Sequence, residues 1–200
     1  MTRWITPLSF LVLAACGGAS PSPTAGGSEG GCMTRAYSQI GGPIALTDHT
    51  GAAVTEADFA GAPAMVFFGF TYCPDVCPMT LVTLEQAYSR LPDGVAPPKT
   101  VLISVDPERD TPEALASYIS TGAFPDDITG LTGSTEAIRA AADAFVADYQ
   151  RIETPESLAT YTMDHTSLLY LMNDNWELAT FFTHGDDPDS MASCLAEHLG

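Results

Sequence analysis

Apolar positions along the chain form short runs and spaced patterns that predict alternating strands and helices. Ala64–Phe70 is a continuous apolar run of strand length, which is typical of a central strand covered on both faces. Thr100–Asp106 is a second run of this kind. Between them, apolar side chains recur at helical spacing over Pro78–Leu91, and proline is accepted at a first helical position. This part of the chain therefore predicts a strand, a helix and a second buried strand.

The segments on either side add a hairpin and two helices. Ile44–Thr55 predicts a β-hairpin, because two strand-like pieces flank residues with turn chemistry. Thr111 has the properties of a helix N-cap, and a proline and an acid follow it. Gly130–Gly133 indicates a short connection or an edge piece. Ser134 is a second N-cap, and the apolar spacing behind it continues as far as Tyr149.

The last third of the chain predicts a strand pair and a closing helix. Ser167–Met172 is a strand, and a turn joins it to an antiparallel partner over Trp176–Phe182. Asp187 opens a helix that ends near Leu199. The full order predicts an α/β class with a thioredoxin-like fold, in which helices flank a central mixed sheet and a β-hairpin precedes it.

The N-terminus has the pattern of an export signal. Arg3 supplies a positive charge, and the apolar stretch Trp4–Leu13 is too short to span a bilayer. Small residues then precede Cys16, as in the lipobox of bacterial lipoproteins. This resemblance implies cleavage before Cys16 and lipidation of its thiol. The alternative is an ordinary secretory signal with an incidental Cys16, and both interpretations place the mature chain outside the cytoplasm, where disulfides are permitted.

The expected domain organisation follows from these patterns. Residues 1–15 are the signal peptide, and residues 16–38 are a lipidated tether rich in Gly, Ser and Pro. Residues 39–200 form the globular domain. The net charge of −18, with only seven Lys and Arg in 200 residues, argues against nucleic acid as a partner. It also argues against docking on anionic lipid through a basic patch.

Two cysteines carry the candidate chemistry. Cys73 and Cys77 are four residues apart, and each precedes a proline at the turn between the first core strand and its helix. Redox pairs of thioredoxin-like folds occupy this turn. The pair is a structural staple, a redox pair or two arms of a metal site. If the segment is helical, the cysteines share one face about 6 Å apart along the axis, which favours a strained, reversible bridge. A nearby helix N-terminus favours thiolates.

A metal site needs a further ligand, and His165 is the candidate. Thiolates select soft metals such as Cu(I), and imidazole suits copper and zinc. His165 is expected on the loop that enters the strand at Ser167, and in a thioredoxin-like fold this loop faces the cysteine turn. The corresponding loop of thioredoxins carries a proline, which is missing here, so a side chain is free to reach the sulfurs. The acids of Asp106–Asp110 are expected to be loop and capping residues at the rim of the site.

Four stretches resemble successive motifs of one family. They are "FFGFTYCPDVCPMT", "VLISVDPERDTPE", "GLTGSTEAI" and "YTMDHTSLLYLM", and they are similar to motifs of the Sco/SenC family from about Ile40 to Leu199. The resemblance implies that Cys73, Cys77 and His165 bind copper, both Cu(I) and Cu(II). It further implies delivery of copper to the CuA centre of cytochrome c oxidase subunit II, reduction of the cysteines of that centre, or both.

The resemblance also implies a location and partners. A lipid on Cys16 would replace the membrane helix that commonly anchors the family, and would hold the domain at the periplasmic face, expected at the inner membrane. A second copper chaperone or a thioredoxin-like reductant is a further expected partner. The leading interpretation is a metallochaperone rather than a turnover enzyme. The alternatives are an exported thiol-disulfide oxidoreductase, or a redox sensor, in which Cys73 and Cys77 cycle and His165 tunes the thiolate.

Two cysteines remain after these assignments. Cys32 precedes the domain and Cys194 lies in the last helix, and exported chains seldom keep unused thiols. We hypothesise a Cys32–Cys194 disulfide that pins the N-terminal segment to this helix. The remaining histidines are expected at the surface: His49, His184 and His198.

Overall fold

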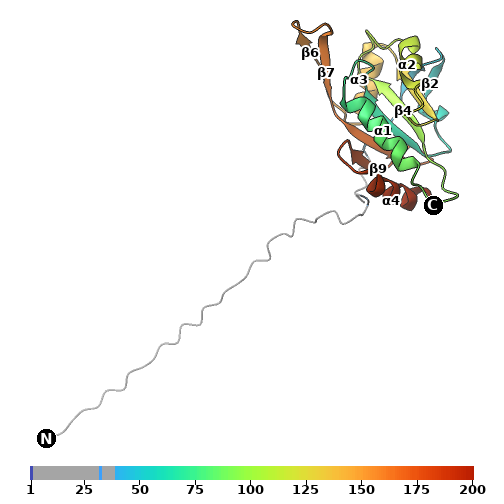
Figure 1. Ribbon diagram of the computed structural model, residues 1–200, viewed down its shortest axis with the longest axis vertical. Coiled ribbons are helices and arrows are strands. Elements are labelled where there is room, and N and C mark those ends of the chain that lie inside the picture. Colours follow the sequence, from blue (N-terminus) through green and yellow to red (C-terminus); the bar gives the residue numbers. More distant parts are fainter. Residues whose placement is uncertain (2–31, 33–38) are drawn as a thin grey trace.

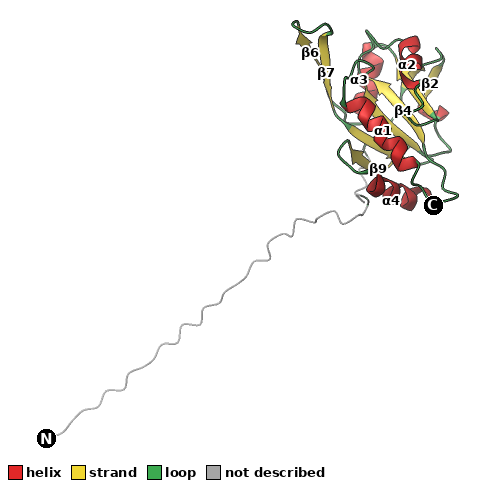
Figure 2. Cartoon of the chain, viewed as in Figure 1, coloured by secondary structure: helices red, strands yellow, loops and turns green. Residues whose placement is uncertain are grey.

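A mixed sheet forms the centre of the domain in the computed structural model, which describes residues 1, 32 and 39–200. Its strands are β1 (Ala45–Asp48), β2 (Ala53–Thr55), β3 (Ala64–Gly69), β4 (Lys99–Ser104), β5 (Ile128–Thr132), β8 (Leu168–Met172) and β9 (Leu178–Thr183). They lie side by side in the order β2-β1-β5-β4-β3-β8-β9 (Figure 2). β4 is parallel to both β3 and β5, and β8 is antiparallel to β3. The sheet is therefore mixed, and the thioredoxin-like α/β class is confirmed.

Helices cover the sheet. They are α1 (Val76–Tyr88), α2 (Pro112–Ile119), α3 (Thr135–Ala144) and α4 (Pro188–Leu199), with a short 3-10 turn η1 (Glu56–Asp58). In the view of Figure 1, α1 stands in front of the sheet and α3 behind it, and α1 packs against α4. The predicted caps are present, since the side chains of Thr111 and Ser134 accept hydrogen bonds from backbone N–H groups of α2 and α3. Among the described residues, no helix is long and apolar enough to cross a bilayer.

β3 is the rigid centre of this arrangement. All six of its residues are buried, so both faces of the strand contribute to the core, as the continuous apolar run predicts. Phe68 contacts the rings of Phe145 and Tyr170 at centroid distances of 5.5 and 6.3 Å. A strand packed in this way has little freedom to move. Its last residue, Gly69, therefore fixes the starting point of the cysteine turn.

A second, two-stranded sheet stands apart from the first. β6 (Tyr149–Thr154) and β7 (Thr160–His165) pair with each other, and they project beyond the main sheet in Figure 1. This differs from the prediction of a helix continuing to Tyr149 and of a loop at His165. The helix ends because Phe145 closes α3 and Val146 has a positive φ of 53°, which breaks helical geometry.

Two further boundaries differ from expectation. Gly130–Gly133 was expected to be a connection or edge piece, but most of it lies in β5, which is paired on both sides by β1 and β4. A Cβ at Gly130 would lie 3.1 Å from the Cβ of Leu115, so the glycine here permits close packing of α2 on the sheet. The helix expected over Pro78–Leu91 begins at Val76 and ends at Tyr88.

Candidate functional site

The two cysteines occupy different local structures. β3 ends at Gly69, and the chain turns before α1 begins at Val76. Cys73 lies in this turn and is half-buried, whereas Cys77 lies in the first turn of α1 and is fully buried. The segment is therefore not helical from Cys73 onward, so the condition for a shared helical face is not met. The two cysteines are held together instead by a hydrogen bond from the backbone N–H of Cys77 to Sγ of Cys73, 3.2 Å long.

A buried carboxylate fixes the start of the cysteine turn. Asp110 is fully buried and accepts hydrogen bonds from the backbone N–H of Thr71 at 3.0 Å and from its hydroxyl at 2.6 Å. The hydroxyl of Ser104, the last residue of β4, donates to the same carboxylate at 2.6 Å. Burial raises the pKa of Asp110, and these hydrogen bonds oppose the rise. Asp110 therefore ties the turn to β4, a role that the expected loop or capping function did not include.

His165 approaches the sulfurs from the second sheet. It is the last residue of β7, and its Nε2 lies 3.7 Å from Sγ of Cys77. Its Nδ1 lies 3.1 Å from the carbonyl oxygen of Thr166. A carbonyl oxygen only accepts, so this contact favours the tautomer with the proton on Nδ1 and turns the lone pair of Nε2 toward Cys77. The rings of Phe67 and Phe70 meet the imidazole at 6.2 and 5.8 Å between centroids and hold its orientation.

The local hydrogen bonds separate the acidities of the two thiols. A hydrogen bond from the thiol of Cys77 and others from backbone N–H groups lower the pKa of Cys73 to about 4, against the effect of burial. Cys77 changes in the other direction, because its hydrogen bond to Cys73 and its burial raise its pKa. At neutral pH the site therefore presents a thiolate at the half-buried Cys73 and a thiol at the buried Cys77, beside the imidazole of His165.

Such a group of donors suits a soft metal or thiol chemistry. Cys73 and Cys77 are free thiols in this structure, and a reversible bridge between them stays a prediction. Within the described residues, the donor atoms of Cys73, Cys77 and His165 do not all lie within 4.8 Å of one another. Ligation by all three would therefore require a small closing movement. The sulfurs, from the turn after β3 and from α1, nonetheless lie close to the imidazole at the end of β7.

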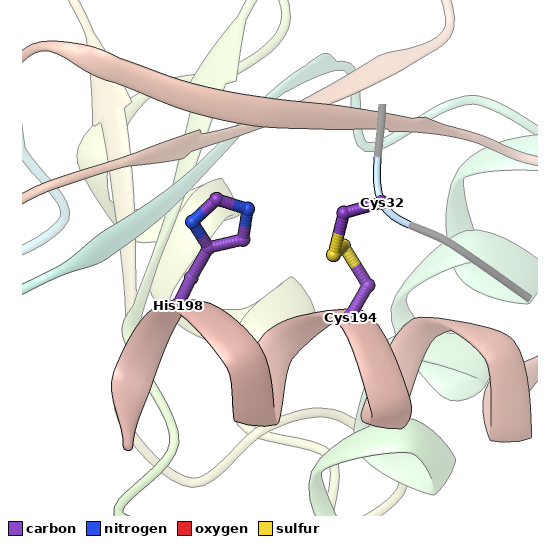
Figure 3. A group of neighbouring side chains, drawn as sticks. All are labelled: Cys32, Cys194 and His198. Atoms are coloured by element: carbon purple, nitrogen blue, oxygen red, sulfur yellow. A yellow bond between two sulfur atoms is a disulfide. The ribbon is translucent and has the colours of Figure 1, made fainter. Parts of the chain in front are cut away.

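Another cysteine pair joins the N-terminal part of the chain to α4. Cys32 and Cys194 form a disulfide with an S–S distance of 2.01 Å and a Cα–Cα distance of 5.0 Å. His198 lies one turn beyond Cys194 on the same face of α4, and its imidazole stands beside the disulfide in Figure 3. Although these three donors lie within 4.8 Å, both sulfurs are consumed by their bond. The Cys32–Cys194 disulfide is therefore a covalent link to α4 and not a metal site. Cys16 and the expected signal and tether lie outside the described residues.

The family model and the curated relatives that match this chain all belong to one family. The family model described as SCO1/SenC matches residues 33–200. Protein SenC of Rhodobacter capsulatus is 38% identical over 160 residues, covering 80% of this chain and 71% of SenC. The human mitochondrial SCO1 homologue is 35% identical over 162 residues, covering 80% of this chain and 53% of that protein.

The structural comparison agrees with the sequence comparison. The crystal structure of Arabidopsis thaliana ScoI with copper bound has a TM-score of 0.75 and 34% identity, covering 80% of this chain and 98% of that one. This chain spans about half the length of the human SCO1 homologue that it matches. The match nonetheless covers almost the whole part of the chain that contains the site. The chain belongs to the SCO1/SenC family.

Proposed function

We propose that this protein binds copper as cargo at Cys73, Cys77 and His165 and delivers it to the CuA centre of cytochrome c oxidase subunit II. The observation that carries the proposal is the 3.7 Å approach of His165 Nε2 to Cys77 Sγ across 88 positions of sequence. Two sulfurs and one imidazole nitrogen form a low-coordinate, soft donor set that suits Cu(I). The relative from Arabidopsis that has copper bound supports the same cargo here.

The surroundings of the site suit transfer to another protein. Cys73 is half-exposed, and three large side chains around it are exposed: Tyr72, Val76 and Met79. On the other side, His165 lines an open hollow of about 240 Å³ together with residues of β6 and β7. Transfer by ligand exchange needs such access, whereas structural metal sites are closed. A lipid on Cys16 would keep this open site near the periplasmic face of the membrane, where oxidase subunits are reached.

A second candidate function uses the same sulfurs for electron transfer. The lowered pKa of Cys73 supplies a thiolate at neutral pH, which favours attack on a partner's disulfide. Cys73 would form a mixed disulfide and release one partner thiolate. Cys77 would then displace the second partner thiolate and close a Cys73–Cys77 bridge. The partner gains two electrons and this chain loses two, so a dithiol reductant of the thioredoxin class would be needed to restore it.

Copper transfer to an apo CuA domain separates these functions. Reduced protein loaded with Cu(I) is mixed with the metal-free CuA domain, either with its cysteines reduced or with them oxidised. CuA absorbance measures delivery, and thiol alkylation measures reduction. His165→Ala should abolish delivery while leaving reduction of the oxidised domain intact. If the reduced wild-type protein retains no Cu(I) against a competing chelator, the copper proposal is wrong.

A further inference from the structure

One arginine joins the cysteine turn to the hairpin that carries His165. The guanidinium of Arg109, in the loop after β4, stacks 3.7 Å from the ring centroid of Tyr161 and 4.6 Å from that of Tyr72. Its Nη1 donates to the carbonyl oxygen of Tyr161 at 3.2 Å, and its Nε donates to Asp106. Tyr72 adjoins Cys73, and Tyr161 lies in β7. Arg109 therefore contacts both parts of the site at once.

Tyr161 has partners on both faces of its ring and at its hydroxyl. The guanidinium of Arg151 also lies over its ring, 3.6 Å from the centroid. Two cations this close to one centroid must occupy opposite faces, so the ring is clamped between Arg109 and Arg151. Its hydroxyl donates to Asp106 at 2.8 Å. Burial and this hydrogen bond raise the pKa of Tyr161 to about 12, so the hydroxyl remains a donor.

The contacts that Arg109 and Arg151 make with Tyr161 hold β7, the strand that ends at His165. Side chains alternate along a strand, so Tyr161, Met163 and His165 share one face of β7. That face is turned toward the domain, since Tyr161 is buried and Met163 packs against the core. His165 lies four residue steps along the extended strand from Tyr161, roughly 13 Å at 3.3 Å per residue. Within this span, fixing Tyr161 limits where the imidazole can lie.

Other contacts hold the hairpin less firmly. Arg139 of α3 stacks on Tyr149 of β6 and pairs with Asp148, but its side chain is 42% exposed and that of Asp148 is 95% exposed. The side chains of Arg109 and Asp106 are only 15% and 3% exposed. Water therefore screens the ion pair between Arg139 and Asp148. The ion pair between Arg109 and Asp106 is shielded from water. The contacts of Arg109 with Tyr161 and Asp106 therefore constrain the hairpin more strongly than those of Arg139.

We propose that Arg109 and Tyr161 are positioning residues of the metal centre, which set the place of His165 relative to Cys77. This inference rests on the proposed function, because it treats His165 as the third copper ligand. Neither residue touches the sulfurs or the metal in this role. They act through β7, by holding the hairpin against the loop that follows β4.

Two conservative variants test the proposal on the whole domain. Tyr161→Phe removes only the hydroxyl that donates to Asp106, and Arg109→Lys keeps the charge but loses the planar fork. Tyr170→Phe is the matched control, because the Tyr170 hydroxyl is buried without a hydrogen-bond partner and lies on β8, outside the hairpin. Cu(I) affinity is measured against a competing chelator. NMR of the His165 imidazole is recorded in the reduced, metal-free protein, and thermal unfolding is followed in parallel.

We expect Tyr161→Phe and Arg109→Lys each to lower Cu(I) affinity by about tenfold, the lower end of the range for residues that orient metal ligands. Both should also shift the metal-free His165 resonances, while Tyr170→Phe should change neither measurement. Lower melting temperatures with unchanged affinity and unchanged His165 resonances would show a merely structural role and overturn the inference. The proposed ligand set would be overturned separately by wild-type Cu(I) affinity in His165→Ala.

Discussion

The backbone N–H of Cys77 donates a hydrogen bond to Sγ of Cys73, so the first turn of α1 stabilises the thiolate that precedes it. With the other hydrogen bonds it receives, Cys73 has a pKa lowered to about 4. We expect titration of the reduced protein at 240 nm to show one thiolate forming near this pH. Cys73→Ser should lack the step, and a single transition in the ordinary thiol range would contradict the assignment.

This shift makes the folding stability depend on pH. A lowered folded-state pKa stabilises the fold fully above the unfolded-state pKa, for which the ordinary value is 9.0. The contribution shrinks below that value and is lost as the pH falls through about 4. Urea unfolding across this range should therefore show the stability difference between wild type and Cys73→Ser shrinking toward acid. A difference that stays constant would argue against a folded-state thiolate.

Gly69→Ala should disturb the packing beneath the site. An added Cβ would lie 2.9 Å from Cε1 of Phe67 and 3.2 Å from Sγ of Cys77, and the fully buried strand leaves little room for relaxation. We expect a loss of about 1–3 kcal/mol in the free energy of unfolding. Gly122→Ala is the control, since a Cβ there meets nothing within 4 Å. Equal stability of the two variants would show that the site tolerates the extra atom.

Asp110→Asn should loosen the cysteine turn. The carboxylate accepts three hydrogen bonds from Thr71 and Ser104, and an amide nitrogen can accept none of them. Leaving buried donors without an acceptor should cost about 1–3 kcal/mol of unfolding free energy. It should also speed alkylation of Cys77, which is otherwise buried. Asp93→Asn, at an exposed loop position, should change neither quantity.

The disulfide predicts a definite thiol count. A variant lacking residues 1–16 should show two free thiols under denaturing, non-reducing conditions, because Cys32 and Cys194 are bonded. Four free thiols would rule out the bridge. Replacing both bridge cysteines with serine should lower the unfolding free energy by about 2–5 kcal/mol. The Cu(I) affinity should stay unchanged, since the bridge lies on α4 and the site does not.

The parts of the fold that sequence predicts well are those where burial and local chemistry agree. β3 is apolar throughout and buried on both faces, and Thr111 and Ser134 supply cap hydroxyls where the helices begin. β5 was harder, because Gly130 lies within it and glycine usually marks a break. Its pairing with β1 and β4 outweighs that local preference, which is a tertiary effect that no local pattern contains.

In the candidate site, too, some features could be predicted from the sequence and others could not. Cys73, Cys77 and His165 could be selected from donor chemistry and motif resemblance, and the structure brings them together. The hairpin that delivers His165 was missed, because the apolar spacing after Ser134 happens to extend to Tyr149 in helical register. β6 is also mostly exposed, so it lacks the apolar alternation of a half-buried strand. Arg109 gave no sequence signal, since its partners come from three separate segments.

The Cys32–Cys194 bond also sets how the domain would bear a mechanical load. Tension applied to the chain upstream of Cys32 passes through the two sulfurs into α4, because a covalent bond is the stiffest path available. The edge strand β2 and its neighbour β1 are bypassed. The force enters through a helix that packs along α1. A pull on the chain upstream of Cys32 would therefore not peel the sheet from its edge.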